Sequence, residues 1–217
     1  MRVQIAGIKT VEDALMCVEY DCDAIGLLVG QSHSSDDFIS KELAKKIIDC
    51  LPPFISSVII THLEESNEII EILKYTNANT VQLHSYICED EVRKIREALP
   101  YVKILRLIHV SEDGRILNKL NDNFVGDCLF LDSINKKTNQ FGGTGLVHDW
   151  NKSAEIVMNS KLPVILAGGL NPNNVRAAIK IVKPYGVDTN SGCKGKDGFR
   201  DEEATKLFIE NSKAIID

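Results

Sequence analysis

Three glycine-rich segments in the second half of the chain have the composition of anion-binding loops. They cover residues 141–145, 167–172 and 188–192, and each follows a short apolar run. Glycine lets backbone N–H groups approach an anion closely, and the N-terminus of a following helix adds a favourable partial charge. We therefore predict a phosphorylated small-molecule ligand. The residues predicted to hold its phosphate are Gly143, Gly145, Gly168, Gly169, Ser191 and Gly192.

The histidines form a second group of residues with chemical potential. His62, His84 and His109 each end an apolar run, whereas His33 and His148 lie in the loops after two other runs. Imidazole titrates near neutral pH, which makes His62 and His84 candidate general bases. Imidazole also binds zinc or iron in other proteins, and a single histidine is often only structural. We favour the general bases, and we expect no metal and no cofactor.

The elements that must position these residues alternate between strand and helix. The strand-like runs are short and continuously apolar, as in strands buried on both faces of a parallel sheet. They cover residues 3–6, 24–29, 57–61, 80–83, 102–108, 128–132, 163–167 and 186–189. The helical patterns cover residues 11–20, 41–50, 65–75, 89–98, 114–120, 152–158, 173–182 and 201–216. Ser40 is predicted to begin the second helix, and the Lys183-Pro184 pair to end the seventh.

Strict alternation of strand and helix predicts a single-domain α/β fold, a (β/α)8 TIM barrel over residues 1–217. In such barrels the active site lies at the C-terminal ends of the strands, and phosphate sites favour the loops after strands seven and eight. The alternative is an open doubly wound sheet, which would favour Gly-x-Gly-x-x-Gly after the first strand. The chain has Ala6-Gly7-Ile8-Lys9 there. The barrel therefore places the glycine loops and the histidines at one rim.

Composition excludes several other classes of protein. The chain has 25 Lys or Arg and 31 Asp or Glu residues, a net charge of −6, which argues against nucleic acid as a partner. No apolar run approaches the roughly 18 residues of a membrane span, and the first residues lack a signal-peptide pattern. We therefore expect a cytoplasmic protein without a membrane partner. The cysteines form no Cys-x-x-Cys pair, and we expect Cys17, Cys50 and Cys128 to be buried.

Four stretches also carry a family resemblance. They are Val81-Gln82-Leu83-His84, Leu131-Asp132-Ser133, Gly142-Gly143-Thr144-Gly145 and Ala167-Gly168-Gly169-Leu170. Together they resemble phosphoribosylanthranilate isomerase, a barrel enzyme of tryptophan biosynthesis. The resemblance implies a ribulose-phosphate-binding barrel that is a monomer or a homodimer. It also implies an Amadori rearrangement of an aldose to a ketose, in which Asp132 is the general acid that opens the sugar ring.

Two positions depart from the pattern of that family. The family has a Cys base at the end of the first strand, where this chain has Ala6, and an Arg near the substrate, where this chain has Asp37. A positioned acid or base contributes about 10²–10⁴-fold in rate, so the reaction requires a different base. We expect an isomerase of this type with an altered base. The candidates for the substrate pocket are His33, Asp37, His109 and His148.

Two alternative functions are consistent with these departures. One is a related sugar-phosphate isomerase or epimerase that acts on a different substrate, and the other is a non-catalytic barrel that binds a phosphorylated ligand. The Thr61-His62-Leu63 segment even resembles the metal-dependent ribulose-phosphate 3-epimerases. That family also requires ligands after its second and seventh strands, and this chain lacks them at both places.

Overall fold

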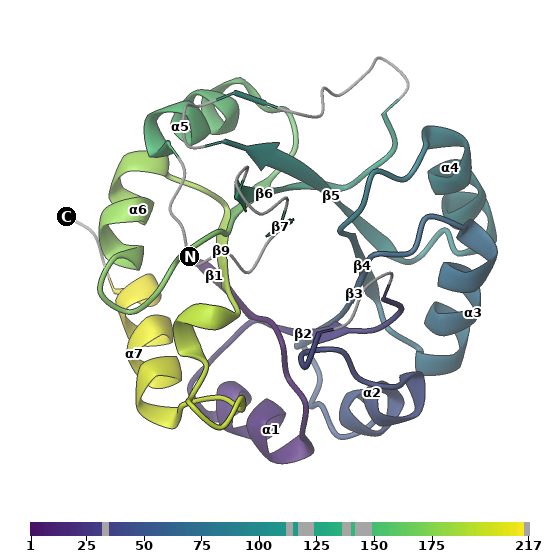
Figure 1. Ribbon diagram of the computed structural model, residues 1–217, viewed down its shortest axis with the longest axis horizontal. Helices are drawn as coiled ribbons and strands as arrows, with labels where there is room; N and C mark the ends of the chain where they lie inside the picture. The colour runs from purple at the N-terminus through teal and green to yellow at the C-terminus, as the bar shows by residue number, and fades with distance from the viewer. Residues whose placement is uncertain (32–34, 112–114, 117–123, 136–139, 142–148, 215–217) are drawn as a thin grey trace.

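The computed structural model describes residues 1–31, 35–111, 115–116, 124–135, 140–141 and 149–214, which form a ring of strands surrounded by helices (Figure 1). The strands are β1 (Arg2–Ile5), β2 (Ala24–Leu28), β3 (Ser56–Thr61), β4 (Thr80–Leu83), β5 (Lys103–Val110), β6 (Cys128–Asn135), β7 (Gln140–Phe141), β8 (Val164–Leu166) and β9 (Gly186–Thr189). The described helices are α1 (Val11–Glu19), α2 (Lys41–Ile48), α3 (Ser66–Thr76), α4 (Glu89–Ala98), α5 (Trp150–Asn159), α6 (Val175–Val182) and α7 (Glu202–Lys213), with a 3₁₀ turn η1 (Ser191–Cys193).

The strands pair in the order β5-β4-β3-β2-β1-β9-β8-β6-β7, and β5 also pairs with β6. This last pairing closes the sheet into a barrel. Every strand except β7 is parallel to its neighbours, while β7 forms a short antiparallel pair with β6. Closure excludes the open doubly wound sheet and confirms the predicted barrel.

Local sequence signals set the bounds of the helices. The Ser40 side chain caps α2 by accepting a hydrogen bond from the Leu43 N–H at 3.1 Å. The helix α6 ends where Lys183 adopts a left-handed conformation with φ of 53°, directly before Pro184. Both signals were predicted from the sequence. The predicted helix over residues 114–120 falls largely outside the described residues, and Ile116, which is described, forms an isolated antiparallel bridge with Val110.

Alternating side chains along each strand fill the two sides of the barrel wall. One set packs outward against the helices as the main core. The other set points inward and forms two smaller apolar clusters. Their buried members are Leu105, Leu107, Cys128, Phe130 and Ala167 in one cluster, and Ala6, Leu28, Val58 and Ile60 in the other. The barrel interior is therefore packed, and polar groups gather around these clusters.

Two expectations about exposure have different outcomes. Cys17 and Cys128 are buried as predicted, but Cys50 is exposed, so that prediction is wrong. Cys50 lies just beyond the end of α2, at a position of the loop toward β3 whose side chain faces solvent. Within the described residues, no helix is long and apolar enough to cross a membrane.

Candidate active site

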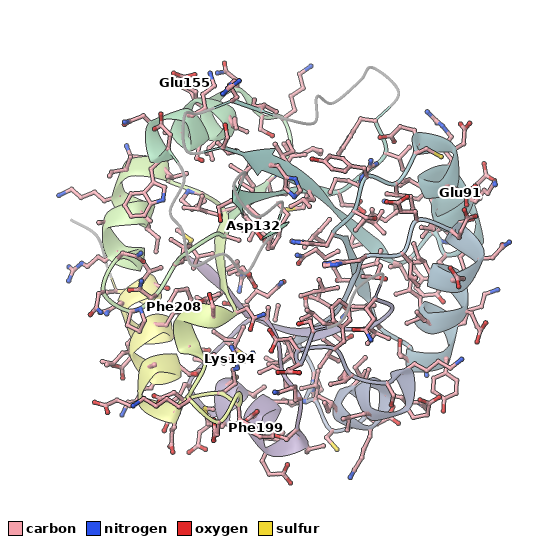
Figure 2. All side chains as sticks on the ribbon, viewed as in Figure 1. Glu91, Asp132, Glu155, Lys194, Phe199 and Phe208 are labelled. Atoms are coloured by element: carbon pink, nitrogen blue, oxygen red, sulfur yellow. The ribbon has the colours of Figure 1, made fainter. Side chains whose placement is uncertain are left out.

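Asp132 is the central carboxyl group inside the ring of strands (Figure 2). It lies near the C-terminal end of β6 and is only 6% exposed. Its Oδ1 accepts a hydrogen bond from the Ser133 N–H at 2.7 Å. Burial raises the pKa of Asp132 to about 7, although the hydrogen bonds of Ser133 act in the opposite direction. A carboxyl with this pKa can donate a proton near neutral pH.

A chain of polar side chains leads from Asp132 across the barrel interior. The His84 Nε2 atom lies 3.5 Å from Asp132 Oδ2. The other ring nitrogen of His84, Nδ1, lies 3.1 Å from Gln82 Nε2. The Gln82 Oε1 atom in turn accepts a hydrogen bond from Gln4 Nε2 at 3.0 Å. The structure therefore brings His84, a predicted site residue, next to the predicted acid, together with two glutamines that the sequence analysis missed.

Asp188 is a second buried carboxyl at the far end of this chain. Strand pairing places Asp188 beside Gln4, and the Gln4 side chain favours the charged form of the Asp188 carboxyl. Burial raises the pKa of Asp188 to about 8, the negative charge of Asp132 raises it further, and Gln4 and Arg200 act in the opposite direction. Its Oδ1 is buried without a hydrogen-bond partner among the described residues.

Asp188 also escaped the sequence analysis as a site residue, because it was considered only as part of a glycine loop. The available signal was its place in the buried run Gly186-Val187-Asp188-Thr189. A carboxyl in the middle of a continuously buried strand requires a partner or a function.

The other histidines of the described rim form an aromatic cluster. The rings of His62 and His84 stack with centroids 5.1 Å apart, and Phe38 packs edge-on against His62 at 5.4 Å. His109 lies 6.5 Å from His84, and its Nδ1 is 3.0 Å from the Tyr86 hydroxyl. Burial, and then the nearby His62, lower the pKa of His109 to about 4. His62 is the partly exposed member of the stack, whereas His84 and His109 are buried.

Ala6 follows β1 and packs into the apolar cluster with Leu28, Val58 and Ile60. It is buried, and its methyl group offers neither a proton nor a lone pair. The groups that transfer protons must therefore come from other strands.

Asp37 is not an isolated negative charge. Its Oδ1 lies 2.5 Å from the Lys194 Nζ, and its Oδ2 accepts a hydrogen bond from Asn190 Nδ2 at 3.1 Å. The buried Arg200 donates to both the backbone and the side-chain oxygen of Asn190. Lys194 lies in the loop after β9 (Figure 2), so the loops that follow β2 and β9 are joined by opposite charges.

The loops after β8 and β9 contain glycines at positions where other residues would be strained or would clash. Gly168 and Gly169 have φ angles of 80° and 67°. A Cβ atom on Gly192 would lie 2.0 Å from the Leu170 oxygen, so only glycine fits there. The Thr189 hydroxyl donates to the same Leu170 oxygen at 2.8 Å, which holds the two loops together. The remaining predicted site residues, Gly143, Gly145, His33 and His148, lie outside the described residues.

Comparison with known proteins identifies the lineage. The family model of N-(5'-phosphoribosyl)anthranilate isomerase matches residues 3–211. The chain belongs to this isomerase family. It is 45% identical to N-(5'-phosphoribosyl)anthranilate isomerase 2 of Methanosarcina mazei, over 98% of this chain and 94% of the relative. The family assignment confirms the resemblance that the sequence motifs indicated.

Solved structures of family members agree with the assignment. The isomerase of Thermotoga maritima has a TM-score of 0.82 at 32% identity, with 98% of each chain covered. Another family structure, with a TM-score of 0.78 and 30% identity over 98% of each chain, contains reduced 1-(o-carboxyphenylamino)-1-deoxyribulose 5-phosphate. A third, with a TM-score of 0.78 and 29% identity over 98% of each chain, is of monomers generated from the dimeric Thermotoga maritima isomerase. The isomerase family thus includes both a ligand complex and a dimer.

Proposed function

We propose that this chain catalyses the Amadori rearrangement of N-(5'-phosphoribosyl)anthranilate in tryptophan biosynthesis, with Asp132 as the general acid. One observation carries the proposal: a buried carboxyl with a pKa of about 7 lies beside the glycine loops of a barrel from this isomerase family. A different sugar-phosphate substrate and a non-catalytic barrel are not favoured, because relatives over nearly the whole chain are isomerases.

The reaction requires four proton transfers at different atoms. Asp132 gives its proton to the furanose ring oxygen as the C1–O bond breaks and the nitrogen lone pair forms a C1=N bond. A base then removes the proton from C2, and the C2–H electron pair forms a C1=C2 bond while the C=N electrons return to nitrogen. Protonation of C1 and loss of the proton on O2 give the ketose. Asp132 suits the first transfer because it is substantially protonated near neutral pH.

His62 is our candidate for the base. Ala6 has no titratable group, His84 is held between Gln82 and Asp132, and burial lowers the pKa of His109 to about 4. His62 is partly exposed at the same rim and stacks on His84, so that only the His84 ring separates it from the acid. Histidine is the side chain that most often serves as a general base in enzymes.

Lys194 compensates for the aspartate at position 37. The ligand in the family complex has a carboxyphenyl group, so an anionic substrate needs a cation at the rim. Asp37 alone would repel that carboxylate, but its charge is balanced by Lys194 at 2.5 Å. We propose that Asp37 orients Lys194 and that the ammonium group binds the aryl carboxylate. We propose that the phosphate binds against Gly168, Gly169, Ser191 and Gly192 in the loops after β8 and β9. The predicted contributions of Gly143 and Gly145 fall outside the described residues.

Complementation tests the proposed function directly. The full chain is expressed in a tryptophan auxotroph that lacks this isomerase, with Asp132→Asn as the control. We expect growth with the natural chain and none with the variant, and a matching loss of activity in the purified protein. The absence of growth and of activity from soluble, folded natural protein would overturn the proposed substrate.

We also propose a cytoplasmic homodimer in which residues 1–217 act as one barrel domain. All six cysteines are free, as is usual in a reducing compartment. Exposed aromatic side chains precede β3, β5 and β9 at the end of the barrel opposite the site, and they are Phe54, Tyr101 and Tyr185. A relative is dimeric. Sedimentation should give twice the chain mass, and Phe54→Lys should shift it to the monomer; a monomeric natural chain would contradict the dimer.

A further inference from the structure

Two glutamines inside the barrel connect the buried carboxyls of Asp188 and Asp132. Gln4 and Gln82 are only 4% and 2% exposed, and neither has a part in the proposed reaction. Burying a polar side chain is costly unless its hydrogen bonds are satisfied. The partners of both amides lie along a single line of side chains: Asp188, Gln4, Gln82, His84 and Asp132.

The donor and the acceptor of each contact along this line of side chains can be assigned. Gln4 lies beside Asp188 and favours its charged form, so the amide nitrogen of Gln4 rather than its oxygen faces the carboxylate. The Gln4 nitrogen also donates to Gln82 Oε1 at 3.0 Å. Because the Gln82 oxygen faces Gln4, its nitrogen faces His84 Nδ1, at 3.1 Å.

The orientation of the Gln82 amide determines which nitrogen of His84 carries the proton. An amide nitrogen only donates, so His84 Nδ1 must accept from Gln82. In the neutral ring the proton then lies on Nε2, which is the atom 3.5 Å from Asp132 Oδ2. The N–H of His84 is therefore directed at the carboxyl that opens the sugar ring.

We propose that Gln4 and Gln82 are positioning residues that hold His84 in the Nε2–H tautomer and thereby couple the proton of Asp132 to that of Asp188. This inference rests on the proposed role of Asp132 as the general acid. A protonated Asp188 has a second pattern open to it, in which its O–H donates to the Gln4 oxygen and both amides are turned over. His84 Nδ1 then faces an oxygen and must carry the proton, so Nε2 becomes an acceptor for protonated Asp132.

Other charged or titratable groups also face these side chains. Arg200 acts on Asp188 from the segment before α7. The His62 ring stacks on His84, and His109 meets it edge-on at 6.5 Å. We call the line of side chains from Asp188 to Asp132 the relay. The neighbouring charged groups shift the pH at which its amides turn over. The two hydrogen-bond patterns follow from the amides themselves, because each presents an oxygen on one side and a nitrogen on the other.

The test measures the His84 ring directly. Nitrogen-15 chemical shifts of labelled histidine distinguish the two tautomers, and the pH profile of kcat reports the acid. We expect Gln4→Met, which lies two side chains away from His84, to change the His84 tautomer ratio. We also expect it to move the kcat profile and lower kcat by about fivefold, the rate equivalent of one net hydrogen bond. Leu105→Met is the matched control, because it places methionine in the barrel interior beside Gln82 without removing any of the hydrogen-bonding side chains.

A second variant tests the same proposal if Gln4→Met does not fold. Gln82→Glu keeps a polar side chain but presents only acceptors, so it should force the proton onto His84 Nδ1. Identical His84 spectra and pH profiles in Gln4→Met, Gln82→Glu and Leu105→Met would overturn the relay. The spectra need no substrate, so they test the relay even if the natural protein lacks the proposed activity. Loss of activity in Asp132→Asn with no effect of the glutamine variants would refute the relay alone.

Discussion

Lys194 Nζ lies 2.5 Å from Asp37 Oδ1, and this ion pair ties together the loops that follow β2 and β9. Both side chains are largely buried, with Lys194 27% and Asp37 15% exposed. The pair places an oriented cation at the rim of the barrel.

Removal of that cation should weaken substrate binding. We expect Lys194→Met to raise KM by about tenfold or more, since hydrogen bonds to charged groups contribute about 1.5–3 kcal/mol. The reason is that Asp37 is then an unbalanced negative charge near an anionic substrate. Steady-state kinetics measure the change. In Asp37→Asn/Lys194→Met most of the repulsion is removed, so KM should recover partly; equal KM values in the single and double variants would contradict this role.

The two buried aspartates should make stability depend on pH. Burial raises the pKa of Asp132 to about 7 and of Asp188 to about 8, whereas both are near 3.9 in an unfolded chain. The folded protein therefore retains protons that the unfolded chain releases between about pH 4 and 8. Their contribution to stability is complete below pH 4 and is lost as the pH rises through 7 and 8.

Asp188→Asn should remove part of this dependence. We expect the variant to be more stable than the natural protein at pH 8.5 and nearly equal to it at pH 4.5, as measured by urea midpoints. The exposed Glu210→Gln is a control that should show no such difference between the two pH values. A constant offset of Asp188→Asn at both pH values would show that Asp188 ionises normally in the folded protein.

His62→Ala should lower kcat by about 10²–10⁴-fold if His62 is the base. Imidazole in the buffer should restore part of the activity, because the truncated side chain leaves space beside His84. Asp132→Asn provides the comparison, since added imidazole cannot replace the acid. Full activity in His62→Ala would transfer the role of base to another group at the rim.

Gly192→Ala tests the contact between the two phosphate loops. A Cβ atom there would lie 2.0 Å from the Leu170 oxygen, so the loops after β8 and β9 must separate. We expect a loss of about 1–3 kcal/mol in the free energy of unfolding, together with a higher KM. Gly195→Ala is the control, because its Cβ would meet first the end of the flexible Asp197 side chain. Equal thermal melting of the two variants would contradict the tight loop contact.

The barrel was predictable because its strands are uniformly apolar and short. The predicted strands 80–83 and 186–189 coincide with β4 and β9. Histidines at strand ends indicated the rim correctly, since the C-terminal end of every parallel strand faces the same way. The sequence also predicted Asp132 as a site residue, and this side chain lies beside His84.

The polar line through the interior was not predictable in the same way. Gln4, Gln82 and Asp188 are far apart in sequence and meet only because β1 pairs with β9 and the barrel closes. The ion pair of Asp37 and Lys194 joins positions that are equally remote. Sequence spacing indicates which face a side chain occupies, but cross-barrel contacts depend on register and closure.

Strand β9 and the loop that follows it position both the buried carboxyl and the rim cation, although the two groups have different roles. Within a few residues it supplies Asp188 to the interior and then leads to Asn190 and Lys194 at the rim. A shift of this strand by one residue would move the buried carboxyl out of the barrel and carry the rim cation away with it. A redesign of the rim for a different aromatic substrate must therefore keep the register of β9 against its neighbouring strands.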